Sequence, residues 1–482
     1  MSKIAADVVS AFTHSASANI LVEHVGSTTS GLSTAKTKIQ VDRRCSRSQT
    51  VCDALQTHAT KSQSCVAKLL DGEAFAHVHR QSFWIANVML IKGAPRALVS
   101  ALATCVAVSR ITLEPTFTLQ VLASSTTLLQ DASTAPQWGV SKIGAPTVWS
   151  SGLQGQGVVV GSIDTGVLYT HDALAGKWRA SHGWFDPQGQ TLLPSDSNGH
   201  GTHVMGTILG ANGIGVAPGA TFITCNGCPG GNCIGSALLA CAQFLLCPTD
   251  PLGGNRNCSM HPHVINNSWG GAGGNDWFNA AIAAWRLAGI VPIFAAGNGG
   301  TACNSVTSPG DSTQVIAVGA TGNGGTTSGT DALAYFSSRG RAAGNGAGIK
   351  PDVSAPGYFV YSAVQTSNSS YGYLAGTSVA TPHVTGAVAL LLSKNISATY
   401  DDVYKLLTTT ADTSTLIPTN QNCGAVADSA YPNNNYGYGR LNVSRAIMAA
   451  PKTTVSSKAI TPKPTTRAPT KVLVGENALP DF

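Results

Sequence analysis

The strongest constraint on the fold is a series of short apolar runs in the middle of the chain. Residues 157–163 (GVVVGSI) are rich in β-branched side chains, as expected for a strand buried on both faces. Similar runs occupy residues 221–224, 263–266, 290–296 and 315–320. Helical patterns between and after them occupy residues 200–209, 235–246, 276–287 and 378–394. This alternation predicts a three-layer α/β fold with a mainly parallel sheet and helices on both faces.

The first 122 residues show a different pattern, which predicts a small ferredoxin-like α+β domain with the order β-α-β-β-α-β. The expected elements are a strand at 19–23, a helix at 46–70, strands at 76–79 and 84–91, a helix at 95–105 and a strand at 109–119. Residues 123–137 are rich in Ser and Thr and are expected to form a linker. Residues 138–449 form the main domain, and residues 450–482 carry the Thr and Pro of a disordered tail.

Charge is scarce and unevenly placed in this chain. Only 11% of the 482 residues are charged, against about 25% in typical domains. The net charge of +6 resides in the N-terminal region and the tail, which leaves the main domain nearly neutral. A nucleic-acid binder would carry a basic patch on its working domain, so this function class is excluded. No apolar stretch reaches the roughly 18 residues that a membrane span needs, so we expect no membrane association.

The chain contains 12 cysteines, four before residue 106 and eight in the main domain. Even numbers in both regions favour disulfides and an oxidising, extracellular location. The run Cys225, Cys228 and Cys233 leaves zinc or redox chemistry open as an alternative. The start of the sequence, MSKIAADVVSAF, lacks the apolar run of a signal peptide, so the sequence gives no direct indication of export.

Ser378 lies in the segment GTSVATPH at residues 376–383, directly before a long apolar helix. A serine at a helix N-terminus lies at the positive end of the helix dipole, near backbone N–H groups that can stabilise an oxyanion. This pattern makes Ser378 a candidate nucleophile. The alternative is a helix N-cap serine, which is common.

His200 opens a helical segment in NGHGTHV at residues 198–204. An exposed imidazole with a pKa near 6.5 suits a general base, so His200 is the candidate for that role. His203 is expected to be a packed or capping histidine. A metal site on the pair is disfavoured because no carboxylate lies between them and the HExxH spacing is absent.

Two polar residues follow predicted strands and complete the candidate site. Asp164 ends the first buried strand, at the edge where α/β sheets place ligands, although it could simply cap the next turn. Asn298 follows another strand in AAGNG, where its amide could donate to an oxyanion, although a plain β-turn Asn is the alternative.

The chain order Asp164, His200, Ser378, together with Asn298, resembles the subtilisin-like serine peptidases (subtilases, the S8 family). The segments GIGVAP at 213–218, NSWGG at 267–271, FSSRG at 336–340 and KPDVSAPG at 350–357 extend this likeness over about residues 138–449. Residues 264–270 and 244–248 most resemble the bacillopeptidase F-like branch.

The resemblance implies a secreted endopeptidase with catalytic residues Asp164, His200 and Ser378 and oxyanion donor Asn298. Ser268, Trp269 and Gly270 would bind an extended peptide substrate, and Thr307 with Ser308 would line the primary specificity pocket. Protein or peptide substrates and a monomeric state are expected. A catalytically inactive homologue, or an esterase or transpeptidase with the same triad, remains the alternative.

The resemblance also implies that residues 1–122 are a propeptide that inhibits the enzyme, with maturation by self-cleavage between about residues 121 and 137. The resemblance implies that no cofactor is required, with a structural calcium ion as an alternative. Residues 211–214 form a shorter segment than the calcium-binding loop of many subtilisins, so the usual calcium site is expected to be absent. The extra disulfides would then constrain this region instead.

Overall fold

The structure of the protein is a computed structural model that describes residues 3–26, 28–41, 46–119, 124–129, 135–322, 329–340 and 348–451. Residues Met1–Ala450 form one compact unit. The predicted tail therefore lies almost entirely outside the described residues. No helix in the described ranges is long and apolar enough to cross a membrane.

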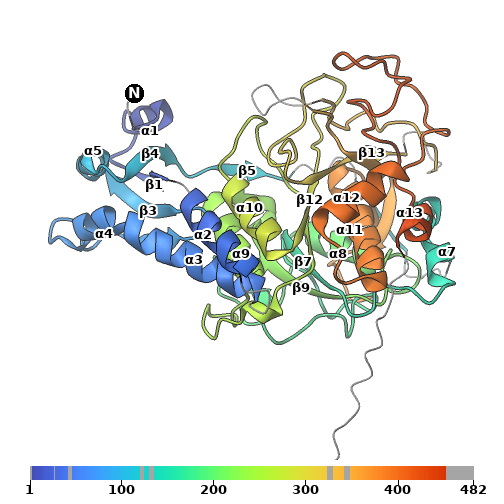
Figure 1. The fold of residues 1–482 in the computed structure, drawn as a ribbon, viewed down its shortest axis with the longest axis horizontal. Coiled ribbons are helices and arrows are strands. Elements are labelled where there is room, and N and C mark those ends of the chain that lie inside the picture. The colour runs from blue at the N-terminus through green and yellow to red at the C-terminus, as the bar shows by residue number, and fades with distance from the viewer. Residues whose placement is uncertain are drawn as a thin grey trace, which may run out of the picture. The chain divides into compact units, whose positions relative to one another are not determined.

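A seven-stranded sheet forms the centre of the main domain (Figure 1). Its strand order is β14-β13-β12-β11-β7-β9-β8, and all neighbours pair in parallel. The strands are β7 (Val159–Asp164), β8 (Trp184–Phe185), β9 (Thr221–Asn226), β11 (Val264–Asn267), β12 (Val291–Ala295), β13 (Ile316–Thr321) and β14 (Val353–Pro356). This confirms the predicted mainly parallel sheet and adds two edge strands, β8 and β14.

Helices cover both faces of this sheet, as predicted. On one face lie α8 (His200–Leu209) and α11 (Thr377–Lys394), and on the other lie α9 (Gly235–Leu246) and α10 (Asn279–Ala288). The central strand β11 shows why two successive residues of such a strand are apolar. Val264 packs into the cluster with α8 and α11, whereas Ile265 packs into the cluster with α9 and α10. Successive side chains of a strand point to opposite faces, so both must be apolar when both faces are covered.

Shorter elements complete the main domain. A capping box between Thr399 and Asp402 begins α12, because each side chain bonds the other's backbone N–H. The remaining elements are α6 (Trp138–Lys142), α7 (Ala145–Trp149), η1 (Pro229–Gly231), β10 (Asn232–Ile234), η2 (Cys258–Met260), β15 (Val360–Ala363), β16 (Tyr371–Leu374), α12 (Tyr400–Thr409) and α13 (Val443–Ala449).

The N-terminal region forms a four-stranded antiparallel sheet with the order β2-β3-β1-β4. This is the strand order of a ferredoxin-like domain. Its elements are α1 (Ala6–Ala11), β1 (Ser17–His24), α2 (Thr29–Val41), α3 (Arg47–Ser62), α4 (Ser64–Asp71), β2 (Arg80–Phe83), β3 (Val88–Pro95), α5 (Arg96–Thr104) and β4 (Val108–Leu113). The helices α1 and α2 were not predicted.

The single helix predicted at 46–70 is wrong, because α3 and α4 are separated at Gln63. The side chains of Ser62 and Gln63 both donate to Asn87 Oδ1, at 2.8 and 3.2 Å. Ser62 Oγ also bonds back to carbonyls of its own helix, a contact that often bends helices. Through these hydrogen bonds, the junction between α3 and α4 contacts the turn between β2 and β3.

Two further strands extend the N-terminal region into the main domain. The strand predicted at 109–119 is divided, since β5 (Thr116–Thr118) leaves the four-stranded sheet and pairs antiparallel with β10. Pro115 lies at the break and has no N–H for a sheet ladder. Within the segment predicted as a linker, β6 (Ser124–Leu129) pairs antiparallel with β16. This part of the segment is therefore a strand.

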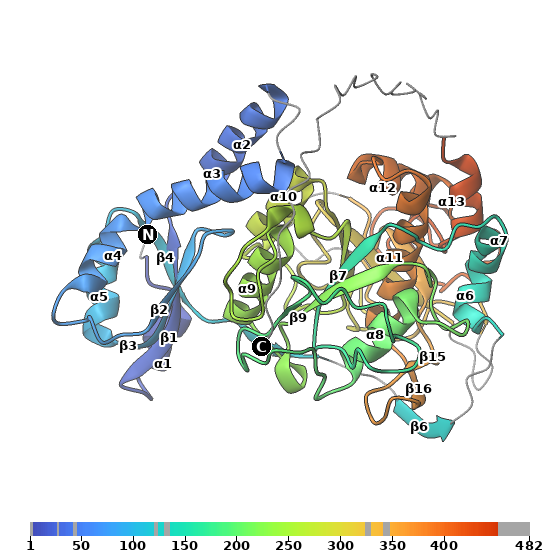
Figure 2. The same ribbon diagram turned by 90° about the horizontal axis from the view of Figure 1, so that it is seen from below.

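Helix α3 lies beside α10 and η2 of the main domain, and α2 also contacts α10 (Figure 2). Ser48 on α3 donates to the carbonyl of Cys258 at 2.8 Å, and both residues are buried. The backbone N–H of Ile85 donates to Gln243 on α9. The N-terminal domain is thus packed on the α9–α10 face of the main domain.

Five disulfides confirm the predicted use of cysteine: Cys65–Cys105, Cys225–Cys241, Cys228–Cys233, Cys247–Cys258 and Cys303–Cys423. The zinc alternative for residues 225–233 is wrong, because these cysteines are bonded in two separate disulfides. The expected complete pairing in the N-terminal domain also fails, since Cys52 is a free, buried thiol. Cys45 lies outside the described residues.

Candidate active site

The fold brings the four predicted site residues to the carboxyl edge of the parallel sheet. Asp164 ends β7 and His200 begins α8. Asn298 follows β12, and Ser378 is the second residue of α11. His200, Asn298 and Ser378 line one cavity of about 450 Å³, and Asp164 is bonded to His200 behind it. The carboxyl edge is where open α/β sheets form ligand sites.

Asp164 and His200 form a short buried pair. Oδ1 of Asp164 lies 2.7 Å from Nδ1 of His200 and also accepts the backbone N–H of Thr165 at 2.8 Å. Asp164 is 1% exposed and His200 is 3% exposed. The expectation of an exposed imidazole is therefore wrong. A proton on Nδ1 held by Asp164 leaves Nε2 as the nitrogen that can take a proton.

The pKa of His200 reflects opposing influences. Burial is the largest and lowers it, but the charge and hydrogen bond of Asp164 and the charge of Asp196 together outweigh burial, so the pKa is raised. Asp196 was missed by the sequence reasoning. It is held by the N–H of Gly199 and by the N–H and hydroxyl of Thr202, although burial raises its own pKa.

His203, one helical turn further along α8, shows how burial changes the pKa of an imidazole that has no acidic partner. It is fully buried, and its Nε2 bonds the carbonyl of Val360 at 2.9 Å. Burial is the main influence and lowers the pKa of His203 to about 3. The structure therefore places His203 in the core, as the packed interpretation expects.

Ser378 is not the N-cap of its helix, because Gly376 occupies that position. Pro382 lies four residues after Ser378 and has no N–H to bond the Ser378 carbonyl, as a regular helix would require. Oγ of Ser268 donates to this carbonyl instead, at 2.7 Å. This bond fixes the backbone of Ser378. The residue is 6% exposed and lines the cavity.

A buried chain of hydrogen bonds continues behind Ser268. Asn266 Nδ2 donates to Ser268 Oγ at 2.9 Å, and Thr385 Oγ1 donates to Asn266 Oδ1 at 2.9 Å. The chain links β11 to α11, since Thr385 lies two turns after Ser378. Ser268 therefore supports the Ser378 backbone in addition to lining the cavity. The sequence analysis assigned Ser268 to substrate binding and did not indicate this supporting role.

The amide of Asn298 is oriented by Thr377. Its Oδ1 accepts both the N–H and the hydroxyl of Thr377, each at 2.9 Å. With the oxygen engaged in this way, Nδ2 is the end of the amide that can donate toward the cavity. A plain turn Asn would not need this double contact.

Trp269, Gly270 and Thr307 also line the cavity. A Cβ on Gly270 would lie 2.6 Å from Thr307 Oγ1, and a Cβ on Gly297 would lie equally close. Gly297 also has a φ of 105°, so only glycine suits this wall. Ser308 differs from the expectation, because it is buried and its hydroxyl donates to Asp311 at 2.8 Å.

The sequence reasoning also missed β10, which pairs with β5. In β10, Cys233 is held to Cys228 by a disulfide and pairs with Phe117 of β5. Phe117 stacks on Trp269 with ring centroids 5.9 Å apart, and Leu119 N–H donates to the Gly231 carbonyl at 2.9 Å. Residues 117–119 line the same cavity as His200 and Ser378. The only signal for β10 was its place in the cysteine-rich segment.

Residues 155–439 match the model described as the subtilase family. This span is more than half of the chain, and the chain belongs to the subtilase family of serine peptidases. It is similar to bacillopeptidase F of Bacillus subtilis (strain 168), with 36% identity over 344 residues, which cover 66% of this chain and 22% of that protein. This match confirms the expected likeness to the bacillopeptidase F-like branch.

Two further relatives are similar to this chain. The extracellular serine proteinase of Thermus sp. (strain Rt41A) is 35% identical over 281 residues, 56% of this chain and 60% of that protein. Subtilisin DY of Bacillus licheniformis is 32% identical over 326 residues, 65% of this chain and 99% of that protein. The aligned part thus spans about a fifth of bacillopeptidase F and nearly all of subtilisin DY.

Proposed function

We propose that the protein is a secreted serine endopeptidase that cleaves peptide bonds through Asp164, His200 and Ser378 and is made as a self-processing zymogen. The observation that carries the proposal is the 2.7 Å Asp164–His200 contact beside a cavity that His200, Asn298 and Ser378 line together. The family and the names of the relatives agree with this activity.

In the acylation step, Ser378 Oγ attacks the carbonyl carbon of the scissile bond, and its proton passes to His200 Nε2. The carbonyl oxygen becomes an oxyanion that accepts hydrogen bonds from Asn298 Nδ2 and from the N–H of Ser378. Asp164 holds the imidazole in the required tautomer and stabilises the imidazolium. His200 then donates the proton to the leaving amine as the C–N bond breaks.

In the deacylation step, His200 takes a proton from water, and the hydroxide oxygen attacks the acyl carbon on Ser378. A second oxyanion forms in the same place. Its collapse breaks the bond to Ser378 Oγ, which recovers the proton from His200 as the peptide acid leaves. No metal or cofactor takes part in either step.

The N-terminal domain is proposed as the propeptide and inhibitor. Its β5 strand pairs with β10, and its residues 117–119 line the catalytic cavity, which supports occupation of the substrate position by the chain itself. An extended substrate would pair with β10 in the same manner, as in β-strand addition. Maturation would then cut between about residues 121 and 137, on the carboxyl side of β5.

The turn at residues 211–214 does not fit a calcium ion. Calcium takes about six to eight oxygen ligands, with carboxylates prominent among them. The turn has no carboxylate, and Asn212 and Gly213 adopt left-handed φ values of 59° and 77° in a tight reversal closed by the Gly215 N–H to Gly210 carbonyl bond. We therefore propose activity without calcium at this place, and a monomer whose partners are peptide substrates and its own propeptide.

A hydrolysis assay tests the activity. Each variant is opened with an added metalloprotease, which is then removed, so that self-processing is not required. We expect Ser378→Ala to lower kcat on a peptide substrate by on the order of 10⁶, as loss of a triad nucleophile does. Ser393→Ala, at the other end of the same helix, is the matched control and should keep kcat. Equal activity of Ser378→Ala and wild type would contradict the proposal.

A further inference from the structure

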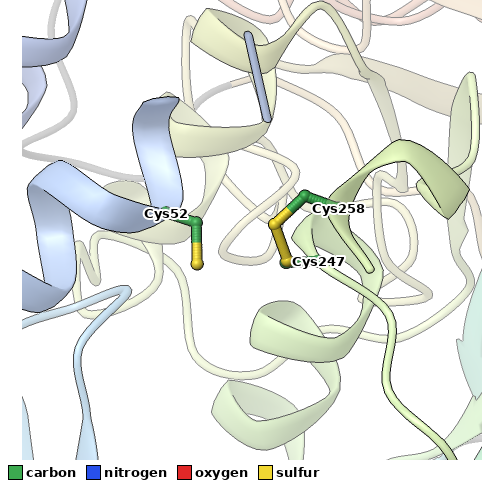
Figure 3. Close-up of side chains that lie close together, drawn as sticks. All are labelled: Cys52, Cys247 and Cys258. Carbon is green, nitrogen blue, oxygen red and sulfur yellow. A yellow bond between two sulfur atoms is a disulfide. The ribbon is translucent and has the colours of Figure 1, made fainter. Parts of the chain in front are cut away.

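Three cysteine sulfurs meet at the boundary between the two domains (Figure 3). Cys52 belongs to α3 of the N-terminal domain, whereas Cys247 and Cys258 are joined in a disulfide of the main domain. All three Sγ atoms lie within 4.8 Å of one another, and all three residues are buried. Among the described residues, Cys52 is the free thiol of the chain.

The contact is fixed on both sides. On α3, Ser48 Oγ donates to the carbonyl of Cys258 itself, one turn before Cys52. On the main-domain side, the guanidinium of Arg256 lies 5.6 Å from the ring centroid of Trp84 in the N-terminal domain and also acts on the Cys52 thiol. Helix α3 therefore holds its thiol against the disulfide whenever the two domains are docked.

We propose that Cys52 undergoes thiol–disulfide exchange with the Cys247–Cys258 bond, which joins the N-terminal domain covalently to the main domain. In this step the Cys52 thiolate forms a bond to one sulfur of the pair. The Cys247–Cys258 bond breaks, and its electron pair leaves on the other sulfur, which takes up the proton. The number of disulfides is unchanged, so no oxidant or reductant is consumed.

The burial of Cys52 and the charges around it determine the rate of the exchange. Burial is the main influence and raises the pKa of Cys52 to about 11, while Arg256 acts against this rise and Asp53 adds to it. At pH 8 only roughly one thiol in a thousand is then ionised, and that fraction rises tenfold with each pH unit. The thiolate is the attacking species, so exchange is slow near neutrality and fast in alkali.

The consequence is a second restraint on the inhibitor. When the chain is cut after β5, non-covalent contacts alone would let the N-terminal domain dissociate. The mixed disulfide retains it until a thiol reagent breaks the bond, so release of the active enzyme becomes dependent on reducing conditions. This consequence rests on the proposed role of the N-terminal domain as a removable inhibitor, whereas the exchange itself does not.

The exchange is tested in the uncut full-length chain carrying Ser378→Ala, which prevents self-cleavage. The protein is held between pH 7 and 9, quenched in acid, alkylated and digested with pepsin, and cross-linked peptides are measured by mass spectrometry. We expect a peptide joining Cys52 to Cys247 or Cys258 to accumulate, with an initial rate that rises about tenfold per pH unit. Arg256→Gln should slow it by about threefold to tenfold, because the thiolate loses its positive neighbour. Arg286→Gln is the matched control, since Arg286 lies over Tyr400 instead.

A cross-linked fraction below about 1% after a day at pH 9 would overturn the proposal, since uncatalysed disulfide rearrangement takes minutes to hours. A Cys45–Cys52 bond in the native chain would overturn it as well. The variant Cys247→Ala provides a second check, because oxidised glutathione should link Cys52 to Cys258 in it. If that link forms in Cys247→Ala but no exchange is seen in the chain with all three cysteines, then the three cysteines lie close together but the proposed exchange does not occur.

The release step is then measured in the active chain on denaturing gels. If the exchange occurs, cut chains run as one band without reductant and as two bands with it, whereas Cys52→Ala runs as two bands in both. Failure of self-cleavage would refute the zymogen proposal but leave the exchange result intact, because an added protease can cut the junction instead.

Discussion

The two domains of this protein differ in how they use their apolar residues. In the main domain, both faces of a parallel sheet are covered by the domain's own helices, and four disulfides brace it. In the N-terminal domain, Ile20 and Val22 face a cluster of that domain, but Leu21 between them belongs to a cluster continuous with the main domain. The smaller domain therefore completes one side of its core only against the larger one.

The candidate catalytic groups and the contacts that hold the N-terminal domain in place therefore belong to different parts of the molecule. All groups of the candidate catalytic site lie on main-domain elements, whereas the N-terminal domain contributes Phe117 and the strand around it to the same cavity. We therefore expect substitutions in the main-domain site to change kcat, and substitutions in the N-terminal domain to change release of that domain with kcat preserved.

Asp164→Asn should lower kcat by about 10⁴, because the amide would hold His200 in the wrong tautomer. The measurement is peptide hydrolysis by a variant opened with an added metalloprotease. The melting temperature serves as the control for folding. A fall in kcat of less than tenfold in a well-folded variant would show that Asp164 is only a turn-capping residue.

Asn298→Ala should lower kcat by about 10²–10³ with little change in KM, since the lost donor acts on the oxyanion and not on the bound substrate. Asn395→Ala, at the carboxyl end of α11, is the matched control and should have no effect on kcat. A change confined to KM would instead identify Asn298 as a substrate-binding residue.

Phe117→Ala should shorten the lag before activity appears by about tenfold while kcat stays unchanged, because stacking on Trp269 and part of the apolar burial are lost. Activity is followed after the junction is cut, with a reductant present to remove any covalent link between the domains. Thr116→Ala, at an exposed position of the same strand that does not line the cavity, should leave the lag unchanged. An altered kcat would show that the N-terminal domain affects catalysis as well as its own release.

Asp196→Asn should shift the rise of kcat/KM toward lower pH. The pKa of His200 is raised in part by the Asp196 charge, and activity needs neutral His200, so it is gained as pH rises through this pKa. Removing the charge lowers the pKa, and the base is then available at lower pH. Asp186→Asn, another carboxylate that accepts backbone N–H groups, is the control and should leave the midpoint in place. An unchanged midpoint in Asp196→Asn would contradict the electrostatic role.

The parallel sheet was predictable because burial on both faces favours apolar side chains at successive strand positions, such as Val264 and Ile265 in β11. The four candidate catalytic residues were predictable because each follows or opens such an element. The predictable signal is therefore local: a buried strand or an apolar helix next to an unusual polar residue.

Other features depend on contacts that the local sequence does not show. β10 is three residues long and becomes a strand only because β5 pairs with it. The support of Ser378 by Ser268 follows from Pro382, but the partner is more than a hundred residues away. The burial of His200 and the meeting of Cys52 with a disulfide likewise depend on tertiary packing, and both were missed.

A fluorophosphonate probe tests whether Ser378 is a nucleophile activated by His200. The opened enzyme is labelled, and the modified residue is located by mass spectrometry; a metalloprotease used for opening does not itself react with the probe. We predict one adduct, on Ser378, that is absent in Ser378→Ala and forms at least about a hundredfold more slowly in His200→Ala. Absence of a Ser378 adduct in wild type would show that Ser378 is not the nucleophile, and equal labelling of Ser378 in His200→Ala would show that His200 does not activate it.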